Sequence, residues 1–169
     1  PQLLPGDHAI LYTEHAAAAG FDGANIVIAP ISPGASVAGV GKVVVRGAYY
    51  GRYVPSGVAA TRRGRTENGH LLYIQHGTLF AAPFDPVRLE IVGTPAPAIE
   101  GLASSSSAGG AQVAFSSEGT VVYVPGLAGS TENPLDWLMR DGKTSVMHAD
   151  RFEWASPRFS PDEIGRAHV

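Results

Sequence analysis

The chain has 169 residues, with 21 glycines, 13 prolines, no cysteine and a formal net charge of −3. The absence of cysteine excludes disulfides and thiolate metal sites, and the slight negative charge provides no general attraction to nucleic acid or anionic membranes. Only 16% of the residues are charged, and no long stretch free of glycine and proline keeps a helical period. This composition predicts one all-β unit built from short strands and tight turns.

A strand–turn–strand pattern recurs along the chain. It is clearest over Ala114–Gly126, where a short strand, a Ser-Ser-Glu-Gly turn and a β-branched strand follow one another. An earlier copy covers Leu4–Tyr12, and a copy split by residues Val58–Gly69 covers Tyr53–Tyr73. The start of a later copy lies at Phe159. The recurrence predicts a repeat architecture.

Three tyrosines occupy equivalent positions in these copies, namely Tyr12, Tyr73 and Tyr123. Repeat folds bury the apolar face of each unit against its neighbours. We therefore expect the three side chains to pack between units rather than to stack on a ligand.

In chain order, strands are predicted over residues 2–4, 9–13, 25–30, 42–46, 50–54, 71–75, 78–82, 97–100, 112–115, 120–124, 135–139, 144–146 and 154–159. His76-Gly77 and Arg140–Lys143 are typical hairpin turns, whereas the serine-rich segment Ala103–Gly110 predicts a flexible connection. Four short antiparallel strands in about fifty residues are typical of a propeller blade. We predict a β-propeller fragment over residues 1–162, with blades at about 1–48, 49–103 and 108–150. The first strand of a further blade, at 154–159, would be unpaired.

Phe115-Ser116 followed by Gly119-Thr120-Val121-Val122-Tyr123, and the shorter Phe159-Ser160-Pro161-Asp162, resemble the PD40 or TolB-type WD40-like propeller repeat. Three further segments, Val45–Gly57, Gly77–Asp85 and Val92–Pro95, are similar to propellers C-terminal to the kinase domain of bacterial transmembrane Ser/Thr protein kinases. The resemblance covers nearly the whole chain up to Asp162, apart from the insert. It implies a noncatalytic sensory or protein-interaction module in the extracytoplasmic, periplasmic part of such a kinase. Its partners would be a protein or peptide and the remaining blades of the same propeller.

Two other classes stay open. One is a propeller that gates a separate peptidase domain, as in tricorn-like or prolyl-oligopeptidase-like proteins, and the other is a free periplasmic scaffold of the TolB kind. Because Pro1 lies inside a repeat, we expect the chain to be a fragment. No apolar run approaches the ~20 residues of a membrane span, so direct membrane insertion is not expected. Residues 163–169 look like a translated sequencing-adapter oligonucleotide and are expected to be a non-native tail.

The sequence motifs provide no catalytic residue, metal ligand or cofactor site. Ser36–Lys42 lacks the first glycine of a phosphate-binding loop, and Val43 replaces its metal-binding hydroxyl. The sequence contains neither a Gly-x-Ser-x-Gly elbow nor a His-Glu-x-x-His pair. The kinase segment itself is missing, so no kinase residue can be assigned. We therefore expect the chain not to be an enzyme.

Tyr50 and Arg52 are the first binding candidates. They belong to the segment Tyr49–Tyr53 at the start of a predicted innermost strand, near the opening of a propeller channel, and this composition is common at binding hot spots. Because strand side chains alternate, Tyr50 and Arg52 should share one face, with Tyr49 and Tyr53 together on the other as core. Simple structural packing remains the alternative for the whole cluster.

Arg62, Arg63 and Arg65 are the second group of binding candidates. They make the insert basic, so this loop could contact an acidic partner or a phosphate. The alternative is an ordinary solvated loop.

Overall fold

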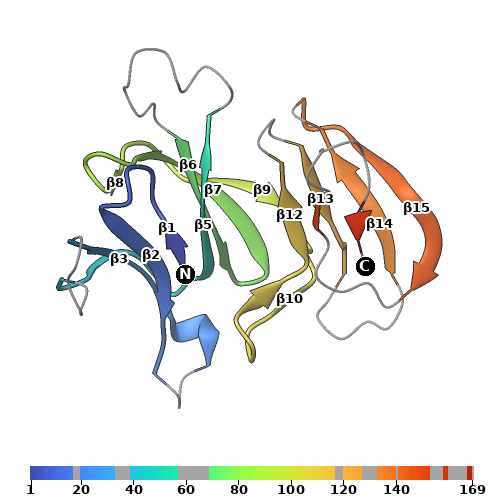
Figure 1. Ribbon diagram of the computed structural model, residues 1–169. Helices are drawn as coiled ribbons and strands as arrows, with labels where there is room; N and C mark the ends of the chain where they lie inside the picture. The colour runs from blue at the N-terminus through green and yellow to red at the C-terminus, as the bar shows by residue number, and fades with distance from the viewer. Residues whose placement is uncertain are drawn as a thin grey trace.

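The computed structural model describes residues 1–16, 20–32, 39–56, 69–116, 120–126, 133–139, 141–152, 158–159 and 167–168. In this part the chain forms two four-stranded sheets, one five-stranded sheet and two two-stranded ribbons (Figure 1). All strand pairs are antiparallel, and the helical content of the described ranges is the single 3₁₀ turn η1 (Phe21–Gly23). No helix in these ranges is long and apolar enough to cross a membrane. The predicted all-β class is confirmed.

The first sheet contains β1 (Gln2–Leu3), β2 (Ala9–Glu14), β3 (Asn25–Pro30) and β4 (Lys42–Arg46), paired in sequence order. Its centre is the apolar strand β3, in which Ile26, Val27 and Ile28 are all buried. The turn between β1 and β2 places Gly6 and Asp7 in the left-handed region, at φ values of 88° and 54°. Glycine adopts this region without strain and aspartate tolerates it, so the predicted first hairpin forms.

The second sheet contains β5 (Tyr49–Pro55), β6 (Gly69–Gln75), β7 (Thr78–Asp85) and β8 (Glu90–Ile91), with β9 (Ala96–Ile99) also paired to β7. His76 and Gly77 connect β6 to β7 at φ values of 50° and 76°, which confirms the predicted two-residue hairpin turn. Pro97 lies in β9, which pairs with β7, and this confirms the predicted short edge strand.

The third sheet contains β12 (Val113–Phe115), β13 (Val121–Tyr123), β14 (Asn133–Leu138) and β15 (Thr144–Phe152). Its second hairpin is longer than predicted, but the turn at Gly142, with a φ of 81°, lies where the sequence places it. The four strands of the third sheet are paired in sequence order, as in the first sheet.

One connection and the last predicted strand differ from the sequence prediction. The serine-rich segment forms a ribbon of β10 (Ser104–Ser105) and β11 (Gly110–Ala111), because Gly109 reverses the chain at a φ of 70°. The strand that ends at Phe159 is not unpaired, since β16 (Arg158–Phe159) pairs with β17 (Ala167–His168). The serine-rich segment thus contains a short ribbon that the sequence did not predict, and the prediction that the last strand is unpaired is wrong for Arg158–Phe159.

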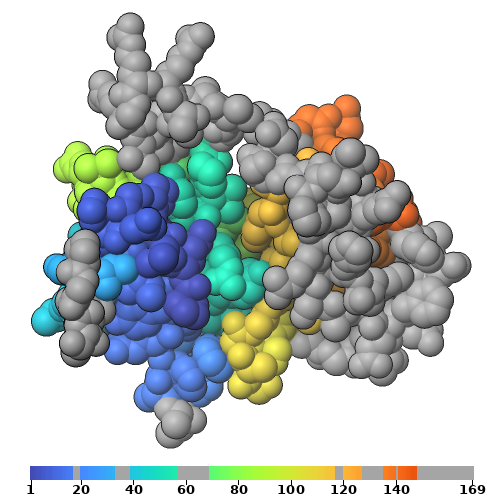
Figure 2. All heavy atoms as spheres, in the orientation of Figure 1, coloured from blue at the N-terminus to red at the C-terminus, as the bar shows by residue number. Residues whose placement is uncertain are grey.

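The three sheets pack face to face in chain order. Leu11 and Ile28 of the first sheet share one apolar cluster with Leu71 and Phe84 of the second. A further cluster joins the opposite face of the second sheet to the third, and its members include Leu72, Ile74, Leu79, Val113 and Tyr123. Figure 2 shows β2 and β3 in blue, β5 in teal and β10 to β12 in yellow to orange side by side on one face. The second sheet is thus covered on both faces.

The equivalent tyrosines lie at corresponding places on the second strand of each sheet. Tyr73 packs between the first and second sheets, where its ring stacks on Phe80 with centroids 5.7 Å apart. Tyr123 packs between the second and third sheets. Tyr12 is half-buried on the outward face of the first sheet, opposite to the face that carries Leu11. Packing between units is confirmed for Tyr73 and Tyr123.

Candidate functional site

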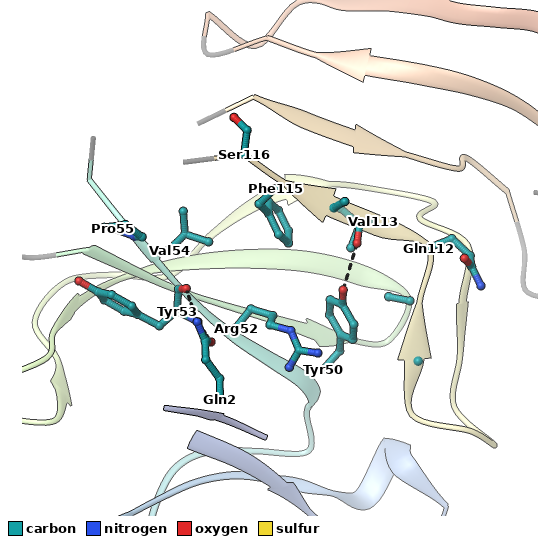
Figure 3. A pocket seen from close by; sticks show the side chains of 13 residues that line it. Gln2, Tyr50, Arg52, Tyr53, Val54, Pro55, Gln112, Val113, Phe115 and Ser116 are labelled. Carbon is teal, nitrogen blue, oxygen red and sulfur yellow. Dashed lines mark hydrogen bonds between the residues drawn. The ribbon is translucent and has the colours of Figure 1, made fainter. Parts of the chain in front are cut away.

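A hollow lies between the edge strands β5 and β12 (Figure 3). Its volume is about 640 Å³, within the range of about 300–1,000 Å³ that is common for ligand pockets. Residues 52–55 and Tyr50 line one side, residues 110–116 line the other, and Gln2 of β1 contributes from the first sheet. We call this hollow the inner-strand pocket.

A β-bulge in β5 positions the side chains on this strand. Tyr49 pairs with Ile74 and Arg52 pairs with Leu72, so β5 has one residue more than β6 over this interval. Tyr50 lies inside the bulge with a φ of 57°, a left-handed conformation that is rare for a tyrosine. The extra residue reverses the alternation of the side chains along β5.

The prediction that Tyr49 and Tyr53 share one face is therefore wrong. Tyr49 packs in the cluster between the second and third sheets, whereas Tyr53 packs between the first and second. Both side chains are buried, with exposures of 2% and 5%, so their assignment to the core is confirmed. The alternation rule failed because it assumes an uninterrupted ladder.

Tyr50 and Arg52, predicted as binding candidates, come together at the wall of the inner-strand pocket. The Tyr50 hydroxyl donates a hydrogen bond of 3.1 Å to the carbonyl oxygen of Val113. The Arg52 guanidinium carbon lies 4.8 Å from the centre of the Tyr50 ring, and its Nη1 donates to the Gly51 carbonyl at 3.1 Å. A cation over an aromatic face is attracted by the ring quadrupole, so each side chain helps to orient the other.

Gln2 is a pocket residue that the sequence patterns did not reveal. Its Nε2 donates to the Tyr53 carbonyl at 3.0 Å, and its Oε1 accepts from the Tyr53 N–H at 2.8 Å. The side-chain amide therefore makes the two hydrogen bonds that a paired strand would make at this point of β5. Because 51 residues separate the partners, only the packing of the first sheet against the second brings them together.

The free edge of β12 also faces the pocket. The Gln112 carbonyl accepts from the Val124 N–H, and the Ser116 N–H donates to the Thr120 carbonyl, so in the register of this pair Ala114 also directs its peptide groups toward β13. The Gln112 N–H donates instead to the Ala103 carbonyl. In an antiparallel pair the intervening residues direct theirs to the opposite side. Val113 and Phe115 are the intervening residues, and the Val113 carbonyl indeed accepts from Tyr50 across the pocket.

The described lining of the pocket has an uneven charge distribution. Arg52 is the only ionised side chain among these lining residues, and the other polar side chains include those of Gln2, Gln112 and Ser116. Phe115 and Val54 supply apolar surface. The arrangement offers one cation, aromatic faces and peptide groups, which can bind a ligand through charge, stacking and hydrogen bonds.

A second, smaller cavity of about 150 Å³ lies between the second and third sheets, with apolar walls that include Leu79, Ile99 and Leu138. His70 lines it, and its Nδ1 lies 3.4 Å from the Ser56 hydroxyl. That distance is longer than the roughly 2.6–3.2 Å of an activated serine–histidine pair.

Asp136 is an electrostatic outlier in the third sheet. It pairs with Tyr123, and its Oδ1 is buried without a hydrogen-bond partner in the part of the chain described. Burial raises the pKa of the Asp136 carboxyl. The pKa of the Tyr123 phenol is also raised, chiefly by burial and further by the negative charge of Asp136. No three His, Asp or Glu side chains among the described residues come close enough together to hold a metal ion.

Arg62, Arg63 and Arg65, the remaining binding candidates, lie outside the described residues.

No family model, curated protein or solved structure matches this chain. The resemblance of its repeats to TolB-type propellers therefore remains a prediction.

Proposed function

We propose that this chain is part of a β-propeller that serves as a noncatalytic sensory or protein-interaction module of a bacterial membrane Ser/Thr kinase. In this proposal the module lies on the extracytoplasmic side and binds its partner in the inner-strand pocket. The sequential order of strands in each sheet and the face-to-face packing of the sheets support the propeller reading. The kinase connection is supported by the sequence resemblance described above.

One observation carries the binding role. The inner-strand pocket joins Gln2, Tyr50 and Val113, which come from three successive sheets, around one half-buried cation, Arg52. The inner strands of a propeller surround its central channel, so the pocket would open onto that channel. Tyrosine and arginine are also the side chains most often found at binding hot spots.

To test this role, phage-displayed random peptides are selected for binding to the immobilised chain. The affinity of the selected peptides is then measured for the unchanged chain and for variants of the pocket. Arg52→Ala removes the cation, and Gly110→Leu adds a side chain at a lining position where a Cβ meets no atom within 4 Å. Arg88→Ala is the control, because Arg88 is exposed and paired with Glu90 at 2.8 Å, outside the pocket lining. We expect both pocket variants, but not the control, to lose the selected peptides.

Two outcomes would overturn the proposal. Failure to select any peptide would reject the pocket as the binding site. Selected peptides that bind both pocket variants with the same affinity as the unchanged chain would reject it too. Turnover of ester, peptide or ATP substrates that is abolished by replacing one Ser, His or Asp would reject the noncatalytic role. Circular dichroism of each variant shows whether its fold is retained.

A further inference from the structure

We infer that the inner-strand pocket takes an extended peptide segment that carries a carboxylate, bound by Arg52 and by the free edge of β12. This inference rests on the proposed binding role and specifies the chemistry of the ligand. The carboxylate can belong to an Asp or Glu side chain or to a peptide C-terminus.

The charge of the pocket favours an anionic group, which in an unmodified peptide is a carboxylate. Arg52 is half-buried, and one of its N–H groups is directed to Gly51 while its face lies over Tyr50. A guanidinium has five N–H donors, so this arrangement leaves donors for a ligand. No described lining residue is acidic, so the walls offer Arg52 no competing carboxylate. Arginine–carboxylate pairs are among the stronger hydrogen-bonded contacts in proteins, particularly where water is partly excluded.

The two edges of the pocket differ in their capacity to pair with a strand. On β5, the Gln2 side chain occupies both peptide groups of Tyr53, and Arg52 donates to the Gly51 carbonyl. On β12, the peptide N–H and C=O of Phe115 are directed into the pocket. An extended segment can therefore add to β12 but not to β5, as in recognition by strand addition.

The pocket also has a closed end and a defined length. The hydrogen bond from Tyr50 to Val113 joins the two walls at the end near β11. From Val113 to Ser116 the edge covers four residues, and a strand rises about 3.3 Å per residue. With a volume of about 640 Å³, the pocket suits a segment of a few residues whose carboxylate reaches Arg52 beside Tyr50 (Figure 3).

The test uses fluorescein-labelled hexapeptide libraries with random flanking positions, and fluorescence anisotropy measures their binding to the full chain. One library has a fixed central Glu and an amidated C-terminus, a second has Gln in its place, and a third has Gln with a free C-terminus. We expect the Glu library, the free-carboxylate library or both to bind at least about tenfold more tightly than the neutral library. Which of the two does so identifies the source of the carboxylate.

Arg52→Gln should remove this preference while keeping a donor and a similar length, and Arg52→Lys should restore part of it. The matched control Arg88→Gln should leave the preference unchanged. N-methylation of alternate peptide amides should weaken binding to the unchanged chain, because it removes donors to the β12 edge.

Equal binding of all three libraries, or a preference that survives Arg52→Gln, would overturn the carboxylate assignment. Unchanged binding of the N-methylated peptides would overturn strand addition. Phage-selected peptides that depend on the pocket but show no preference for a carboxylate would reject this inference and leave the proposed function intact. Failure to select any pocket-dependent peptide would reject both.

Discussion

The phenol of Tyr50 donates to the backbone carbonyl of Val113 at 3.1 Å, across 63 residues of sequence. This contact joins β5 and β12, the edge strands of two adjacent sheets, and closes one end of the inner-strand pocket. Tyr50 has a φ of 57°, and a left-handed conformation costs roughly 1–2 kcal/mol for a residue with a Cβ. The bulge in β5 is thus coupled to the packing of the second sheet against the third.

Tyr50→Phe should lower the free energy of unfolding by about 0.5–1.5 kcal/mol, because it removes the hydroxyl and leaves the Val113 carbonyl without this donor. Urea denaturation measures the change. Tyr12→Phe is the matched control, since Tyr12 is half-buried on the outward face of the first sheet. An effect no larger than that of the control would show that the contact does not stabilise the chain.

Asp136→Asn should stabilise the chain at neutral pH. The pKa of Asp136 is raised by burial, so the folded state holds this proton more tightly than the unfolded state. Stability then decreases as the pH rises from the ordinary value of 3.8 through the raised value, and the penalty is complete above it. Because the side chain is partly exposed, we expect a gain of about 1 kcal/mol or less at neutral pH. Denaturation of both proteins at acidic and neutral pH measures it.

Asp85→Asn should change the pH dependence in the opposite direction. The pKa of the Asp85 carboxyl is lowered, first by the Arg88 backbone N–H and then by the Val87 N–H, which donate to its Oδ1 at 3.0 and 2.8 Å. Its contribution is present above the ordinary pKa and is lost as the pH falls through the lowered value. Similar pH profiles for both asparagine variants would contradict the burial argument for Asp136.

Gly51→Ala should destabilise the chain by about 1–3 kcal/mol. A Cβ at Gly51 would lie 2.9 Å from Cγ2 of Ile26, so the first and second sheets would have to separate or Ile26 would have to leave its rotamer. Gly110→Ala is the control, because a Cβ there meets no atom within 4 Å. Thermal or urea melts compare the two, and equal stabilities would contradict close packing at Gly51.

The chain should associate in a concentration-dependent manner through the outward face of its first sheet. Leu3 is 56% exposed there, and Ile10 and Tyr12 beside it are only half-buried. Apolar sheet faces of this kind are normally covered by a neighbouring unit in repeat folds. Leu3→Glu should reduce association in sedimentation experiments, whereas Val87→Glu, at a position 70% exposed on the β7–β8 connection, should not. A monodisperse unchanged chain at all concentrations would contradict this prediction.

The local pattern of residue types in the sequence was sufficient to predict most of the strands and one of the tight turns. Alternating β-branched and aromatic residues predicted the strands, and His76-Gly77 predicted a hairpin because two left-handed residues suit its turn. The repeat also predicted that Tyr73 and Tyr123 would be buried between units, as found. These features follow from interactions within a few residues or from repetition, so the sequence displays them directly.

The tertiary structure decided the arrangement of the pocket. The extra residue of β5 between Tyr49 and Arg52 places Tyr49 and Tyr53 on opposite faces of the sheet, and such a bulge cannot be recognised from the sequence pattern of the strand. Gln2 reaches Tyr53 only after the first sheet has packed on the second. The strength of a hydrogen bond changes when the donor–acceptor distance changes by a few tenths of an ångström. When the donor and the acceptor are far apart in the sequence, tertiary packing sets that distance.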